Sequence, residues 1–245
     1  MNDFISLMQA HRSIRTYTDK AIEQECLESL IQAGQAAATS SFIQACTVIQ
    51  VAKGDKRDQL AAFAGNQSYV AAAPVFLVFC ADMHRHKVAC EMHDELMQSG
   101  YTEQFLTASV DCALFAQNVV VAAESMGLGT CYIGGIRNEI EQVSSLLELP
   151  ELVFPVFGLC LGYPAQQPEI KPRLPLSTVL KQERYDCETE RAELAAYDQQ
   201  IEKYYQMRSS AKKQMNWTEQ ISSMLQKEAR PHMLSFLNKK GFINK

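Results

Sequence analysis

The sequence predicts an α+β fold of short strands and long helices, and three observations lead to this prediction. The run 75–81 is continuously apolar, as expected of a strand buried on both faces. Apolar residues between 23 and 38 recur at helical spacing. The stretch 103–126 is apolar on too many sides for a surface helix, which predicts a helix buried between layers.

The elements of the N-terminal half follow from these patterns. They are helices at residues 3–10, 23–38 and 55–64 and strands at residues 47–52 and 75–81. The apolar face of the second helix carries Leu27, Leu30, Ile31 and Gly34. The third helix is charged.

The next elements are a polar helix near residues 84–98, the helix 103–126, a strand at 131–134, a helix at 139–149 and a strand at 154–162. Gly127 and Gly129 are expected to end the long helix. Asn138 and Glu141 have the spacing of a capping box, and Pro150 lies beyond the end of that helix.

Composition excludes several classes of protein. The chain has 245 residues, 47% of them hydrophobic, which is enough for a core without disulfides or metal. Its 23 basic and 28 acidic residues give a net charge of −5, so no general affinity for nucleic acid is expected. The eight cysteines form no C-x-x-C pair and are expected to be free thiols in a reducing cytoplasm. Polar residues interrupt the apolar stretch 105–126, so we expect no membrane span; they are Asp111, Gln117, Asn118 and Glu124.

The composition changes after Pro175. We expect residues 1–175 to form the core and residues 176–245 a polar, largely helical extension of the same domain. Its apolar positions, such as Tyr197 and Ile201, are scattered. We therefore expect the extension to have no core of its own and to wrap the main body or a second subunit.

The segment HRSIR, residues 11–15, concentrates hydrogen-bond donors directly after the first helix. His11, Arg12, Ser13 and Arg15 suit an anion that has a phosphate and a flat polar edge, because planar guanidinium groups match both shapes. The alternative is that these cations only complement the dipole at the end of the helix.

Two further segments could contact the same kind of ligand. Gly134 and Gly135 lie between a predicted strand and helix, where glycine permits positive φ and lets a ligand approach the backbone. Lys171 and Arg173 lie on one side of an extended segment and suit a phosphate monoester. A plain turn and a solvated loop are the respective alternatives.

Small polar groups form the last candidates. Thr39, Ser40 and Ser41 precede Phe42, an aromatic residue expected to be exposed, and Gln67 could recognise the edge of a pyrimidine. Turn and capping chemistry would explain the same residues.

Other motifs are absent or weak. The glycines around residue 129 follow a helix instead of a strand, which argues against a dinucleotide fingerprint. The sequence has no P-loop and no G-x-S-x-G motif. On a helix, His86, Cys90 and His93 would share one face that could bind a metal, although a solvated helix explains this polar segment better.

Motifs along nearly the whole chain carry a resemblance. They are HRSIR (11–15), TSSF (39–42), GNQ (65–67), AAESMGLG (122–129), YIGGIRN (132–138), FGLCLGYP (157–164), KPRLP (171–175), YDQQIEKYY (197–205) and EARP (228–231). In this order they resemble the FMN-dependent nitroreductase superfamily, and most closely its branch of oxygen-insensitive NADPH nitroreductases and NADPH–flavin oxidoreductases. The resemblance implies a central, mostly antiparallel sheet flanked by helices. It also implies an intertwined homodimer in which the C-terminal extension embraces the partner.

The resemblance further implies one noncovalent FMN per subunit, bound at the dimer interface. The residues implied to bind it are His11, Arg12, Ser13, Arg15, Thr39, Ser40, Ser41, Gln67, Tyr132, Ile133, Gly134, Gly135, Lys171 and Arg173. Among them, Arg15 would lie beside flavin N1 and the C2 carbonyl, and Gln67 would recognise the pyrimidine edge. The hydroxyl residues 39–41 would come from the other subunit.

The activity implied is ping-pong hydride transfer from NADPH to nitroaromatics, quinones or free flavin. Phe42, Arg208 and Arg230 would contact the substrate or NADPH, with Lys212 and Lys213 as further candidates near the 2′-phosphate. The chemistry needs no acid–base residue of the protein. Two other functions stay open: a flavin-binding sensor without turnover, and a metal-dependent hydrolase that uses residues 84–94.

Overall fold

The computed structural model describes residues 2–208 and 215–245 and consists of two compact units. Unit 1 comprises Met1–Gln167 together with Arg230–Lys245, and unit 2 comprises Pro168–Ala229. The chain thus leaves unit 1 eight residues before the predicted end of the core at 175. The last part of the predicted extension returns to unit 1.

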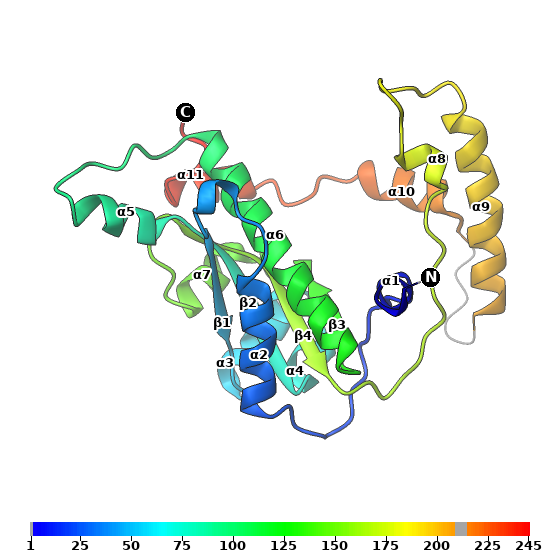
Figure 1. Cartoon of the computed structure of the whole chain (residues 1–245), viewed down its shortest axis with the longest axis horizontal. Coiled ribbons are helices and arrows are strands. Elements are labelled where there is room, and N and C mark those ends of the chain that lie inside the picture. Colours follow the sequence, from blue (N-terminus) through cyan, green and yellow to red (C-terminus); the bar gives the residue numbers. More distant parts are fainter. Residues whose placement is uncertain (1, 209–214) are drawn as a thin grey trace. The chain divides into compact units, whose positions relative to one another are not determined.

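Unit 1 is built on a four-stranded sheet with the order β1-β2-β4-β3, in which every neighbouring pair is antiparallel (Figure 1). The strands are β1 (Cys46–Gln50), β2 (Val75–Asp82), β3 (Gly129–Ile133) and β4 (Val153–Gly162). All residues of β2 are buried, as the continuous apolar run predicts. The α+β prediction and the antiparallel sheet are confirmed.

Helices cover both faces of the sheet. The side chains of β2 alternate, so that Phe76 and Val78 pack on one face while Leu77 and Phe79 pack on the other. The first face is covered by α3 (Asp55–Phe63), α4 (Ser68–Ala72), the 3₁₀ helix η2 (Gly134–Arg137) and α7 (Ile140–Leu146). The second is covered by α2 (Gln24–Gln35) and α6 (Thr102–Ser125).

The long helix α6 packs on the sheet with one face only, and 33% of its most apolar stretch is buried, so the prediction of a helix buried between layers is met in part. The helix is long and apolar enough by composition to cross a membrane, a property it shares with core helices of globular proteins. It contacts α2 closely at Gly34, where an added Cβ would lie 2.2 Å from Cε1 of Phe115. Near its N-terminal end, Ala108 and Cys112 pack against α11 (Met233–Lys239).

Unit 2 contains α8 (Leu176–Val179), α9 (Glu190–Met207) and α10 (Trp217–Leu225). Tyr197, Ile201 and Tyr205 of α9 are buried together, and the ring of Tyr197 lies 5.9 Å from that of Trp217. The expectation that this region has no core of its own is therefore wrong, although its cluster is small.

Three local predictions are corrected. The helix α5 ends at Glu91 instead of residue 98, so His93 does not lie on the helix with His86 and Cys90. No group of three metal-ligating side chains occurs in the described part of the chain, which removes the basis of the hydrolase alternative. The helix α7 begins at Ile140 with Glu139 as its N-cap residue and has no side-chain cap, so the predicted capping box of Asn138 and Glu141 does not form. The Asn138 side chain accepts a hydrogen bond from Nε of Arg230.

A further correction concerns Gly129, which begins β3 and does not simply end the preceding helix. An added Cβ there would lie 2.6 Å from Cγ1 of Ile14. Glycine at this position lets residues 11–15 approach the edge of the sheet.

Candidate functional site

The HRSIR segment runs beside the edge strand β3. The amide of Ile14 donates to the carbonyl of Thr130 at 2.8 Å, and Ser13 forms a parallel bridge with the same residue. Ile14 is buried, whereas Arg15 is exposed. Because side chains alternate along an extended segment, Ser13 and Arg15 face away from the side on which Ile14 packs.

Arg15, Tyr69 and Gln67 form a polar group next to this segment. The guanidinium of Arg15 lies 5.8 Å from the centre of the Tyr69 ring, and the Tyr69 hydroxyl donates to Oε1 of Gln67 at 2.7 Å. Burial raises the pKa of Tyr69, and a hydrogen bond with Arg15 opposes that rise. The structure thus brings together Arg15 and Gln67, two residues predicted separately, through a tyrosine that sequence analysis did not select.

The same group extends to β3 and the Gly-Gly turn. Burial raises the pKa of the Cys131 thiol, and the charge of Arg15 and a hydrogen bond with Ser13 oppose it. An added Cβ at Gly135 would lie 2.4 Å from the Ala64 carbonyl oxygen and 2.8 Å from Nε2 of Gln67. Gly135 therefore lets the backbone approach the Gln67 amide. The positive φ that glycine permits is not used there.

Arg230 lies beside the Gly-Gly turn. Its guanidinium donates to the Gly134 carbonyl at 3.4 Å and to Oδ1 of Asn138 at 3.0 Å. Burial, together with the nearby charge of Arg230, lowers the pKa of Arg137. Two cations therefore border this turn in unit 1. Tyr132, which precedes it, is partly exposed, and Ile133 is buried.

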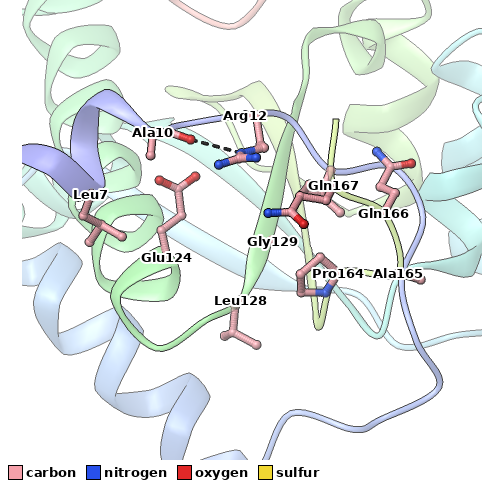
Figure 2. A pocket seen from close by; sticks show the side chains of 11 residues that line it. Leu7, Ala10, Arg12, Glu124, Leu128, Gly129, Pro164, Ala165, Gln166 and Gln167 are labelled. Atoms are coloured by element: carbon pink, nitrogen blue, oxygen red, sulfur yellow. Dashed lines mark hydrogen bonds between the residues drawn. The ribbon is translucent and has the colours of Figure 1, made fainter. Parts of the chain in front are cut away.

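Arg12 lines a cavity of about 550 Å³. His11 is not in the lining but contacts Glu124, which is. Nδ1 of His11 lies 2.6 Å from Oε1 of Glu124, and Nε of Arg12 donates to the Ala10 carbonyl at 3.2 Å. Arg12 and Glu124 line the cavity, and Figure 2 shows both side chains at one wall of it. Its other walls include Leu7, Ile14, Leu128, Pro164 and Gln167. Sequence analysis did not select Glu124 for this role.

The segment of residues 39–44, which we name the Phe42 loop, contains the short 3₁₀ helix η1 (Ser40–Phe42). Ser41, Phe42 and Gln44 have φ values of 48°, 58° and 53°. Phe42 is 80% exposed, as predicted, although the ring is apolar. The Thr39 hydroxyl donates to Oδ2 of Asp111 at 2.5 Å.

The remaining predicted site residues belong to unit 2. The Lys171 ammonium lies 5.7 Å from the Tyr205 ring, and the Tyr197 hydroxyl donates to the Pro172 carbonyl at 2.8 Å, which ties this segment to α9. Arg208 directly follows α9, and its Nε is buried with no hydrogen-bond partner among the described residues. Lys212 and Lys213 lie outside the described residues.

Comparisons with known proteins agree with this arrangement. Residues 8–163 match the model of the nitroreductase family, and residues 171–245 match that of the C-terminal domain of the nitroreductase family. The chain belongs to the nitroreductase family. The resemblance inferred from the motifs is thereby confirmed.

Similarity to individual family members extends over whole chains. The protein is 44% identical to the NADPH-flavin oxidoreductase of Vibrio harveyi, with all of both chains covered. It is 42% identical to the oxygen-insensitive NADPH nitroreductase of Salmonella typhimurium, again over both full lengths. The crystal structure of nitroreductase A from Vibrio parahaemolyticus matches with a TM-score of 0.92 at 44% identity over both full chains.

Tyr69, Asp111 and Glu124 contact the predicted site residues Gln67, Thr39 and His11 but were not themselves predicted from the sequence. Asp111 and Glu124 were visible as carboxylates inside an apolar helix, a signal used only to argue against a membrane span. A carboxylate buried to that extent needs hydrogen-bond donors, and its partners were the information missing from the sequence. Tyr69 gave no comparable signal.

Proposed function

We propose that this protein is an FMN-dependent NAD(P)H oxidoreductase that reduces nitroaromatics, quinones or free flavin and prefers NADPH. The observation that carries the proposal is the group of Arg15, Tyr69 and Gln67 beside the Gly-Gly turn. Relatives support the proposed function, because two proteins that match this chain over nearly its whole length are named NADPH-flavin oxidoreductase and FMN reductase (NADPH).

The residues present fit FMN. A flavin ring offers carbonyl oxygens and ring nitrogens along one edge, and this group offers a guanidinium, an amide and a backbone turn closely packed against that amide. Gly135 is required there, because any larger residue would meet Gln67 and Ala64. The donor set matches a flat polar ligand better than it matches a metal ion.

Each residue has a proposed role. Arg15 would lie beside N1 and the C2 carbonyl of the flavin, where its positive charge would stabilise negative charge that appears on reduction. Gln67 would bind the pyrimidine edge, and the backbone of residues 132–135 would face N5. His11, Arg12 and Ser13 would bind the phosphate. The family resemblance assigns the same role to Lys171 and Arg173.

When bound, FMN supplies the redox chemistry, taking up a hydride from NAD(P)H and passing electrons to an acceptor. The protein residues hold and orient the reactants. The donor and the acceptor use one site in turn, so the kinetics are expected to be ping-pong. Phe42 and Arg230 border the position of the substrate.

The proposed active form is a homodimer in a reducing cytoplasm. Apolar side chains on the exposed sides of α1 (Asp3–Gln9) and α6 support this; they are Phe4, Ile5, Met8, Leu106, Val110 and Leu114. Thr39, Ser40 and Ser41 would contact FMN bound mainly by the partner subunit. The extension would wrap that subunit.

Release of the cofactor tests the proposal most directly. The purified protein should be yellow, and heating should release a compound that co-elutes with FMN in chromatography. Under anaerobic conditions NADPH should bleach the bound flavin, and a nitroaromatic acceptor should restore the colour. Folded protein that binds FAD or no flavin would contradict the proposal. Bound FMN that NADPH does not bleach would indicate a flavin-binding sensor instead.

A further inference from the structure

Two elements far apart in the sequence hold the Phe42 loop. The first is α6, through Asp111, whose side chain is 4% exposed. Its Oδ2 accepts from the Thr39 hydroxyl at 2.5 Å and from the Ala45 amide at 3.0 Å, and its Oδ1 accepts from the Ser40 amide at 3.3 Å. One buried carboxylate therefore binds the first two residues of the loop and Ala45, the residue directly after it.

The second element is the first turn of α5 (His84–Glu91). The Arg85 guanidinium donates from Nη1 to the Gln44 carbonyl at 2.9 Å and to the Cys46 carbonyl at 3.1 Å. Nε2 of His86 lies 2.5 Å from the Ile43 carbonyl oxygen. Because a carbonyl oxygen only accepts, this ring nitrogen carries the proton. The backbone of the loop is thus bound at consecutive residues.

The position of Arg85 is itself determined by neighbouring polar groups. Oδ1 of Asp82 accepts from the His84 amide at 2.9 Å, at the start of α5, and its Oδ2 lies 3.3 Å from Nη2 of Arg85. The same nitrogen donates to the Thr47 hydroxyl at 2.7 Å. The first turn of α5 is therefore attached to β1 and β2 and serves as a fixed support for the loop.

This support maintains a conformation that is unfavourable by itself. Three non-glycine residues of the Phe42 loop have positive φ, which persists only where the surroundings impose it. The result is an apolar ring directed into solvent. The backbone strain does not stabilise the chain, so it indicates a functional use of the loop that carries Phe42.

We propose that Asp111, Arg85 and His86 are positioning residues that set the selectivity for electron acceptors by holding Phe42 in one orientation. The proposal rests on the function proposed above, in which Phe42 contacts the acceptor. A fixed ring favours flat aromatic acceptors, because stacking then costs little conformational entropy. It gives no advantage to a compact inorganic acceptor such as ferricyanide.

Hydrogen exchange of the FMN-loaded protein tests the structural half of this proposal. In Asp111→Ala the amides of Ser40 and Ala45 should exchange at least about tenfold faster than in the parent protein, since both lose their acceptor. In Asp111→Asn the remaining carbonyl oxygen should restore part of the protection. Glu103→Gln, which removes an exposed carboxylate from the same helix, is the matched control and should leave both rates unchanged. Unchanged exchange in Asp111→Ala would overturn the proposal.

A double-mutant cycle tests the functional half. Asp111→Ala should lower kcat/KM for nitrobenzene about tenfold, mainly through KM, while ferricyanide reduction stays within about twofold. In a Phe42→Ala background the same substitution should have no further effect, because its action passes through Phe42. An equal loss in both backgrounds, or an equal loss with both acceptors, would overturn the proposal.

One further variant and the choice of readouts keep the proposed role of the positioning residues separable from the proposed function of the protein. Arg85→Lys keeps the positive charge but has one donor nitrogen where Arg85 uses two, so it cannot donate to the loop carbonyls and to Thr47 and Asp82 at the same time. It replaces Asp111→Ala if that variant does not fold. A parent protein that reduces neither acceptor would refute the proposed function. Hydrogen exchange would still decide whether Asp111 and Arg85 hold the loop.

Discussion

Replacing Arg15 with alanine should lower the reduction potential of the bound flavin and leave the fold nearly intact. Within the protein the guanidinium contacts the Tyr69 ring at 5.8 Å and hydrogen bonds to that residue. A cation–π contact at an exposed site contributes about 0.5–1 kcal/mol. The hydrogen bond adds about 0.5–1.5 kcal/mol, so the expected loss of stability is about 1–2.5 kcal/mol, or roughly 2–10 °C in Tm for a chain of this size.

The effect on the cofactor is separate from the effect on stability. A charge-assisted hydrogen bond contributes about 1.5–3 kcal/mol. Because Arg15 is exposed in the described chain, we take the lower end of this range, about 1.5 kcal/mol. For a two-electron couple that energy corresponds to a potential about 30 mV more negative. The positive charge meets negative charge that exists only after reduction, so FMN affinity should change less than the potential.

Spectroelectrochemical titration of the FMN-loaded variants measures this shift. Arg15→Lys retains the charge and should recover part of the potential. Lys20→Ala is a matched control, because it removes an ammonium that lies 3.9 Å from the ring of Tyr163, outside the proposed site. An unchanged potential in Arg15→Ala with full flavin occupancy would refute the role assigned to Arg15.

Three further outcomes are expected. Gly135→Ala should lower Tm, because the added Cβ would lie 2.4 Å from the Ala64 carbonyl oxygen and overpacking costs about 1–3 kcal/mol. Differential scanning calorimetry measures the loss. A Tm equal to that of the parent protein would contradict the close packing. Arg208→Ala should raise KM for NADPH roughly ten- to hundredfold in steady-state assays and leave NADH nearly unaffected; equal changes with both nucleotides would mean that Arg208 does not recognise the 2′-phosphate. Sedimentation at low micromolar concentration should show a dimer, because the exposed apolar side chains of α1 and α6 need a partner surface; a stable monomer with bound flavin would exclude this assembly.

Sequence alone determined the kind and order of most elements of unit 1. The strands β2 and β4 were evident because a strand buried on both faces must be apolar throughout. The helix α2 was evident because its apolar residues recur at helical spacing. Such patterns are local, so no knowledge of distant contacts was needed. The HRSIR and Gly-Gly segments were likewise visible as unusual concentrations of donors and glycines.

The tertiary structure decided which of these residues meet and why some are present. Arg15 reaches Gln67 through Tyr69, and the Asn138 side chain binds Arg230, 92 residues away, instead of the start of α7. Gly129 serves the approach of Ile14 to the sheet and is more than the end of a helix. Asp111, which looked like a polar interruption of an apolar helix, holds a loop that lies about 70 residues earlier in the chain. Contacts between distant segments depend on how the layers pack, and no local periodicity encodes them.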